Sequence, residues 1–85
     1  MTLKEILEVL VKGIVQTEED VAIKDSTTTM HGKETLHFKI KVKKEEFSLL
    51  VGKGGSTIIA LRTVMAKLAG KQKKVVYVDL DENKR

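Results

Sequence analysis

Three glycines within the four residues Gly-Lys-Gly-Gly, at positions 52–55, constrain this sequence more than any other segment. They separate two runs of helical spacing. Phe47, Leu50 and Val51 recur before them, and Ile58, Leu61, Met65 and Leu68 recur after them. Glycine accepts the left-handed backbone that ends a helix, so Gly52 is expected to end the first helix. Ser56 or Thr57 is expected to cap the second, which should run to about Ala69 and end at Gly70. The segment therefore predicts two helices joined by a tight turn.

Periodic patterns on either side of this turn predict the other elements. Thr2 and Glu5 have the spacing of a capping box, at the start of a helix expected from Leu3 to Gln16. Residues 21–24, 36–43 and 75–80 read as strands, the second with strict alternation of apolar and polar residues. The polar stretch Asp25–Glu34 is expected to be a loop, with the first two strands paired as a hairpin.

The resulting order is helix-strand-strand-helix-helix-strand. Its simplest packing is an α+β fold in which helices cover one face of a three-stranded sheet. A chain of 85 residues has room for one domain. We expect its core to span about residues 3–81 and the charged tail 82–85 to be frayed.

Composition excludes several classes of function. There is no cysteine, and the two histidines, His31 and His37, are too few for a zinc site. No apolar run approaches the roughly 20 residues that span a bilayer, so a cytoplasmic location is the default expectation. No catalytic set of side chains is visible. The sequence therefore predicts a protein that is not an enzyme and needs no cofactor or metal.

Positive charge is concentrated in the middle of the chain. Residues 1–32 hold three Lys and six acids, a net charge of −3, whereas residues 33–74 hold ten Lys, one Arg and three acids, a net charge of +8. Residues 75–85 add −1, which gives the total of +4. A basic region of this kind suits a polyanionic partner, although Lys is also an ordinary surface residue.

The glycine segment allows three interpretations. It is a helix-helix turn, a nucleotide phosphate loop, or the GxxG loop that clamps about four nucleotides of single-stranded nucleic acid. The nucleotide loop needs a glycine where Phe47 stands and a Ser or Thr where Gly54 stands, and it follows a strand rather than a helix. The dinucleotide pattern fails because Thr57 occupies the place of its third glycine. Spacing thus favours the clamp over both nucleotide-binding loops.

Residues 50–58 (Leu-Val-Gly-Lys-Gly-Gly-Ser-Thr-Ile) and 60–64 (Ala-Leu-Arg-Thr-Val) resemble the GxxG region of KH domains. Over nearly its whole length the chain resembles the small bacterial KhpA/YlqC family, which implies one type II-like KH domain that binds single-stranded RNA. The resemblance implies phosphate contacts from Gly52, Lys53, Gly54 and Gly55. It implies an apolar groove from Val51 and Ile58, with Ile59 and Arg62 in the groove or at its rim. Asp25–Glu34 would be the variable loop, bringing Lys33 and His31 to the far wall.

One departure concerns Ser56, which stands where relatives commonly have a basic residue. This implies a lost phosphate contact or a hydroxyl hydrogen bond in its place, and hence a weak clamp. Only three aromatic residues are present, and Phe38 and Phe47 fall on core stripes, so bases are expected to meet aliphatic side chains.

The resemblance also implies partners and a cellular role. Related proteins self-associate or pair with a larger KH protein of the KhpB/Jag type, and the family is linked to RNA chaperoning and to cell elongation and division. The alternative function is therefore a dimerising module whose RNA binding depends on such a partner, with Ile59 as a candidate contact. Lys39, Lys41 and Lys43 form either a second phosphate-binding stripe or, as we favour here, a solvated face guarded against edge pairing.

Overall fold

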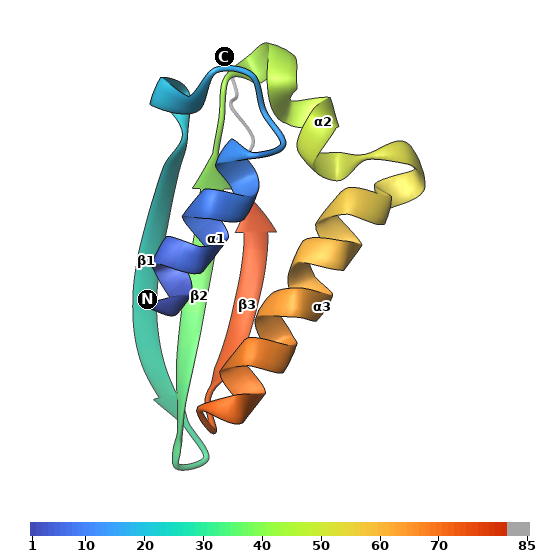
Figure 1. The fold of residues 1–85 in the computed structure, drawn as a ribbon. Helices are drawn as coiled ribbons and strands as arrows, with labels where there is room; N and C mark the ends of the chain where they lie inside the picture. Colours follow the sequence, from blue (N-terminus) through green and yellow to red (C-terminus); the bar gives the residue numbers. More distant parts are fainter. Residues whose placement is uncertain (82–85) are drawn as a thin grey trace.

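The computed structural model describes residues 1–81 and has one sheet with helices on a single face (Figure 1). In chain order the main elements are α1 (Leu3–Lys12), β1 (Ala22–Met30), β2 (Lys33–Lys41), α2 (Phe47–Val51), α3 (Ser56–Lys71) and β3 (Val75–Leu80). Short 3₁₀ turns form η1 (Glu18–Asp20), η2 (Lys44–Glu46) and η3 (Lys53–Gly55). The expected element order and α+β class are confirmed. The expectation of a frayed tail at 82–85 lies outside the described residues.

The sheet is mixed, with the strand order β1-β2-β3. β1 and β2 are antiparallel, from the pair Ala22 and Lys41 to the pair Met30 and Lys33, as expected for a hairpin. β3 runs parallel to β2, with Leu36 opposite Val76 and Phe38 opposite Val78. A parallel neighbour requires a crossover, and here α2 and α3 supply it. β2 is therefore the central strand, and β3 has one open edge.

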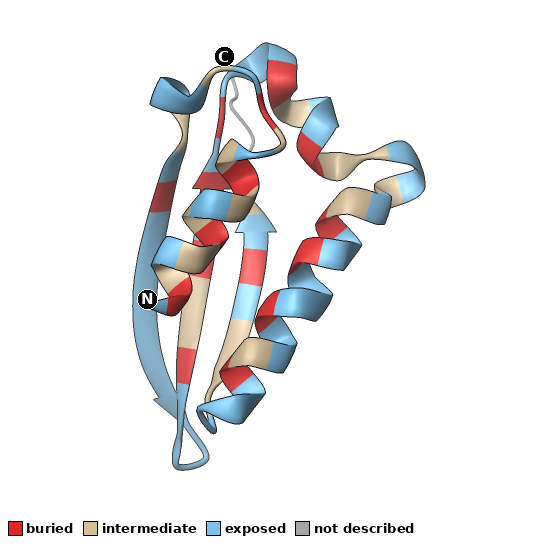
Figure 2. Ribbon diagram, in the orientation of Figure 1, coloured by how far each residue is buried: buried red, intermediate tan, exposed pale blue. Residues whose placement is uncertain are grey.

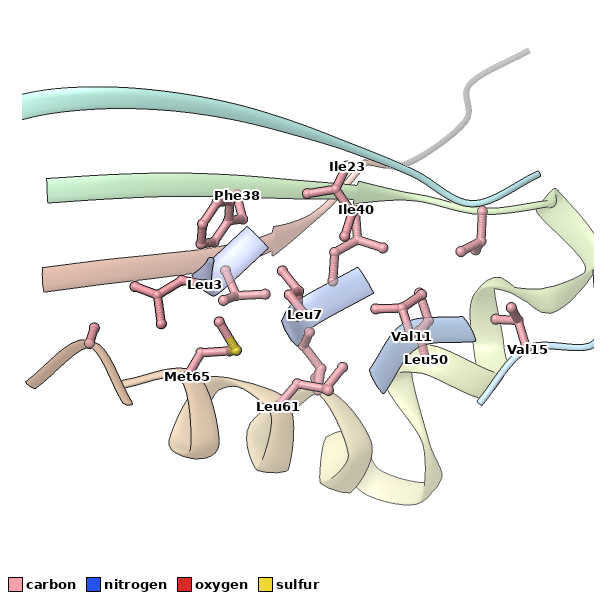
Figure 3. Close-up of a cluster of buried hydrophobic side chains, with 14 residues drawn as sticks. Leu3, Leu7, Val11, Val15, Ile23, Phe38, Ile40, Leu50, Leu61 and Met65 are labelled. Carbon is pink, nitrogen blue, oxygen red and sulfur yellow. The ribbon is translucent and has the colours of Figure 1, made fainter. Parts of the chain in front are cut away.

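The core lies between the sheet and the two longer helices (Figure 3). α1 contributes Leu3, Leu7 and Val11, and α3 contributes Leu61 and Met65, all of them buried. Phe38 and Ile40 of β2 point into the same layer, as the alternation of the strand predicts. The glycine loop, by contrast, stands out from this layer, with Lys53 and Gly54 exposed and none of its four residues buried (Figure 2).

The capping box at the start of α1 is confirmed. The hydroxyl of Thr2 accepts a hydrogen bond from the backbone N–H of Glu5 at 3.1 Å, and the backbone N–H of Thr2 donates to Glu5 Oε1 at 2.8 Å. The bond from the backbone N–H of Thr2 to the Glu5 carboxylate lowers the pKa of Glu5, because it stabilises the charged form. The box fixes the first turn of the helix that covers β1 and β2.

The expected loop Asp25–Glu34 is wrong, because most of it is strand. β1 continues to Met30, and β2 begins at Lys33. Only His31 and Gly32 form the turn, both with positive φ (52° and 78°), as in tight hairpin turns. Beyond Ile23 every residue of β1 is exposed, so this part of the strand has no buried face and no alternation that would reveal it.

Two helix ends also differ from expectation. α1 ends at Lys12 with Gly13 at its C-cap, although Val15 N–H still donates to Val11 O at 3.1 Å. α3 continues through Gly70 to Lys71, and the chain turns at Lys73, which has a φ of 59°.

No single helix among residues 1–81 is long and apolar enough to cross a bilayer. The segments Lys44–Val51 and Lys53–Lys71 satisfy the length and composition requirements only as a pair bent by 48°.

A buried carboxylate anchors the segment that leads into α2. Glu46, only 8% exposed, accepts hydrogen bonds from the backbone N–H of Thr17 at 3.1 Å and from its hydroxyl at 3.0 Å. Thr17 lies in the connection between α1 and β1, so this contact joins segments 29 residues apart.

We predict that Glu46→Ala lowers the free energy of unfolding by about 2 kcal/mol, because it leaves the part-buried N–H and hydroxyl of Thr17 without their acceptor. Glu46→Gln is the matched control, since its amide oxygen still accepts one hydrogen bond and the loss should be smaller. Urea denaturation of both variants measures the difference. Equal stability of the alanine variant and the wild type would contradict the anchoring role.

Candidate nucleic-acid interface

The loop between α2 and α3 is a run of left-handed glycines. α2 closes with a hydrogen bond from Gly52 N–H to Ser48 O at 2.9 Å, and Gly55 N–H then donates to Gly52 O at 3.1 Å. The φ angles of Gly52, Gly54 and Gly55 are 77°, 61° and 80°. Side chains rarely adopt such angles, which explains three glycines in so short a segment.

Gly52 is required for a second reason, which is contact with Thr57. A Cβ atom at position 52 would lie 2.7 Å from both the backbone nitrogen and the Cβ of Thr57, and closer still to its hydroxyl. Such distances are far below van der Waals contact. A Cβ at Gly54, in contrast, would meet nothing within 4 Å. Gly52 therefore sets how closely α2 and α3 join, and Gly54 serves the open side of the loop.

The open side of the loop presents backbone and one cation. Lys53 and Gly54 are exposed, and Lys53 carries the loop's only side chain. The expected cap by Ser56 or Thr57 is wrong: Gly55 occupies the N-cap, Ser56 is the first helical residue, and no side chain in the described part of the chain caps this end. Helix N-terminal N–H groups without a side-chain acceptor attract anions, as does the Lys53 ammonium.

The apolar residues expected around the loop separate into two groups. Ile58 is 7% exposed and belongs to the buried core, so it supports the loop from below, and Val51 is half-buried. Ile59 is 57% exposed, and its Cδ1 lies 3.9 Å from the position a Cβ would take on Gly55. Ile59 is therefore the apolar side chain that adjoins the open loop.

Arg62 links this helix to the open edge of the sheet. Its Nε donates a hydrogen bond to Val78 O at 2.8 Å, and its guanidinium lies 3.2 Å from Asp79 Oδ1. Arg62 and Ile59 are one turn apart, so they share a side of α3. The guanidinium satisfies a carbonyl on the unpaired edge of β3 and remains partly exposed. The sequence placed Arg62 near the loop but gave no sign of its two partners.

Lys33 and His31 are not brought together with the loop. Both lie at the tip of the β1–β2 hairpin, at one end of a molecule that is 39 Å long, whereas the glycine loop lies toward the other end (Figure 1). Their expected place on the far wall depended on residues 25–34 forming a loop. The paired strands hold this segment extended instead.

The mixed three-stranded sheet, the helices on one face and the Gly-Lys-Gly-Gly turn between α2 and α3 define a KH domain. A comparison with protein families matches residues 4–80 to the family described as KhpA/KhpB, KH domain. The chain belongs to this family.

Curated relatives align along nearly their whole length. The "RNA-binding protein KhpA" of Chlamydia pneumoniae is 30% identical over 82 residues, which cover 96% of this chain and 100% of that protein. The protein of that name from Clostridium perfringens is 32% identical, covering 92% and 99%, and that of Mycobacterium bovis is 34% identical, covering 89% and 90%.

Solved structures show the same fold at low sequence identity. Era of Aquifex aeolicus bound to GDP and AlF4 superposes with a TM-score of 0.66 at 11% identity. An Era complex with MgGDPNP and a 16S ribosomal RNA fragment gives 0.67 at 14% identity. Each match covers 95% of this chain but only 31% of the Era chain, so it concerns the fold of one part of Era.

We predict that Gly52→Ala destabilises the protein by about 3 kcal/mol, because left-handed strain and overlap with Thr57 add together. Gly54→Ala, with free space around it, should cost only about 1 kcal/mol. Thermal or urea unfolding measures both. Equal losses of stability at the two positions would show that the contact with Thr57 does not determine the conformation of the loop.

Proposed function

We propose that this protein binds single-stranded RNA through the loop at residues 52–55. The observation that carries the proposal is the exposed, side-chain-free backbone of Gly54 beside Lys53, at an N-terminus of α3 without a side-chain cap. A phosphate can approach such a backbone closely and accept hydrogen bonds from its N–H groups. The positive charge of the lysine attracts it further. Relatives named as RNA-binding proteins support RNA as the partner.

In this proposal each neighbouring residue has a defined part. Ile59 contacts the base beside the loop, because it is apolar, exposed and adjacent to Gly55. Arg62 forms the rim, where Asp79 neutralises part of its charge.

The remaining residues support the loop or lie away from it. Ser56 offers a hydroxyl in place of a cation, and half-buried Val51 supports the loop with Ile58 beneath it. Lys33 lies too far along the hairpin to act with this group.

We further propose that the affinity of one copy is modest and depends on salt. About four nucleotides fit one GxxG loop, and a single lysine neutralises little of their charge. An RNA chaperone or post-transcriptional regulator in the cytoplasm needs such reversible contacts. A second copy, or a larger KH partner of the KhpB/Jag type, would increase the affinity through multivalency.

Changing Lys53 and Gly54 both to Asp should abolish binding to a short single-stranded RNA at low salt, because two carboxylates replace the cation and face the phosphate. The Gly54 position has room for the new side chain. The matched control is Gly70→Asp with Lys71→Asp, the same pair of changes at the exposed far end of α3. Fluorescence anisotropy measures binding, and circular dichroism checks the fold.

The control variant should bind within about two-fold of the wild type, since the changed charges lie far from the loop. Unchanged affinity of the Lys53 and Gly54 variant would remove the loop from the binding site. Equal loss in both variants would assign the effect to net charge alone.

The exposure of Ile59 also favours a second candidate function, in which the domain serves mainly to pair with another protein. An isoleucine that is 57% exposed is costly in water and suits an apolar contact. Ile59→Asp should then convert a dimer to a monomer in sedimentation, while Val9→Asp, at an equally exposed apolar site on α1, should not. A wild-type protein that is monomeric at high concentration would contradict self-association.

A further inference from the structure

The sheet face turned away from the helices carries a basic and aromatic surface. Phe38 and Ile40 face the core, so alternation directs Lys33, His37, Lys39 and Lys41 to the other side of β2. Strand pairing adds Lys24 opposite Lys39 on β1, and Tyr77 opposite His37 on β3. We refer to the group Lys24, Lys33, His37, Lys39, Lys41 and Tyr77 as the outer face.

Two rings at the centre of the outer face stack on each other. The ring centroids of His37 and Tyr77 are 5.4 Å apart, with planes inclined by 23°. The Nε2 atom of His37 lies 3.1 Å from the Thr28 hydroxyl, a hydrogen bond that fixes the imidazole. Tyr77 is nevertheless 55% exposed. Because His37 covers one side of the Tyr77 ring, its other side faces away from β2, past the open edge of β3.

The charge of the outer face suits a polyanion. Its four lysines have two neighbouring acids on β3 and its continuation: Asp79, whose carboxylate pairs with Arg62, and Asp81, whose N–H donates a hydrogen bond to Ile40 O. Asp25 and Glu34, on the alternate strand positions, pair with Lys4 of α1 and with Lys74. A second copy placed on this face would oppose four lysines with four more, which argues against a sheet-to-sheet dimer.

Protection of a sheet edge does not explain Lys39. This residue lies on the part of β2 that pairs with both β1 and β3, so no edge needs guarding there, whereas Lys33 and Lys41 lie beyond the pairing with β3. A shallow depression of about 620 Å³ lies beside both rings, and its lining includes Lys24 and Lys39 together with Asp25 and Asp79.

Arg62 connects the outer face to the glycine loop. It extends from α3, on the helix side, to Asp79, whose side chain stands on the outer face between Arg62 and the lysines. Ile59 lies between Arg62 and the loop, one turn earlier. An extended RNA chain that leaves the loop along this side of α3 would therefore reach Arg62 first. It would then pass the edge of β3 and reach the free side of the Tyr77 ring.

We propose that the outer face is a second contact surface for single-stranded RNA, on which a base stacks against Tyr77 while Lys24, Lys39 and Lys41 bind the phosphates on either side. This inference rests on the proposed RNA binding of the loop and extends it to a longer strand. Stacking on an aromatic ring and cations along a backbone are the usual means of holding single strands with little sequence preference.

The first test compares RNA lengths. Tyr77→Ala should raise the Kd for a single-stranded RNA of about twelve nucleotides roughly ten-fold, because one base loses its ring. It should leave the Kd for an RNA of about four nucleotides, the length the loop holds, unchanged. Tyr77→Phe keeps the ring and should bind both RNAs like the wild type. Equal weakening for both lengths, or no weakening for the longer RNA, would overturn the proposal that the outer face binds RNA.

The second test uses the ring itself as the probe. Tyr77 is the only tyrosine, and there is no tryptophan, so tyrosine emission reports on this ring alone. Saturation with the longer oligonucleotide should quench it, whereas the four-nucleotide RNA should not. Emission that is unchanged at saturation would contradict base stacking on Tyr77.

A charge control separates specific contacts from net charge. Lys39→Glu should weaken binding of the longer RNA and reduce its salt dependence, while Lys12→Glu, the same change on α1, should do so much less.

The Lys53 and Gly54 variant distinguishes the proposal for the loop from the proposal for the outer face. If it loses both RNAs while Tyr77→Ala binds normally, only the outer face is rejected. If Tyr77→Ala loses the longer RNA and the loop variant does not, only the loop is rejected. Failure of the wild type to bind either RNA would reject both.

Discussion

The close contact between Gly52 and Thr57 is the constraint on which the site depends. Two helices can join through so short a segment only if the backbone at position 52 is left-handed and has no Cβ, since Thr57 occupies that space. The same contact fixes the first turn of α3, so it aims the exposed Lys53 and Gly54 away from the core. Packing of Ile58 and Leu50 beneath the loop then holds this direction. A rigid support of this kind keeps an irregular segment in one conformation.

Arg62 has a comparable role between the two layers of the fold. Its hydrogen bond to Val78 O occupies the open edge of β3, which would otherwise invite pairing with another strand. Its contact with Asp79 extends the charged surface around that edge. One side chain thus serves the sheet, borders the proposed RNA site at the loop and connects it with the proposed contact at Tyr77. Such shared use explains why an arginine, with its planar set of donors, suits this position.

The predictions from the sequence succeeded where a buried face imposes a period. The stripes of α1 and α3, the alternation around Phe38 and the strand 75–80 all have one side in the core, and each was located within a few residues. The 25–30 part of β1 was missed because both of its faces are exposed. The Ser56 cap was also wrong, because the turn places Gly55 at the N-cap. The local pattern of apolar and polar residues does not indicate which strand pairs with an exposed segment, or how packing shapes a turn.

The sequence by itself determined the fold class, the KH-type loop and the absence of any cysteine chemistry, because hydrophobic period and glycine spacing are local properties of the chain. Only the tertiary structure decided which residues share a surface. It buried Ile58 and exposed Ile59, moved Lys33 far from the loop, and brought Tyr77 onto His37 across two strands. These relations depend on strand order and on a parallel crossover, which join residues far apart in the chain and leave no periodic sign in it.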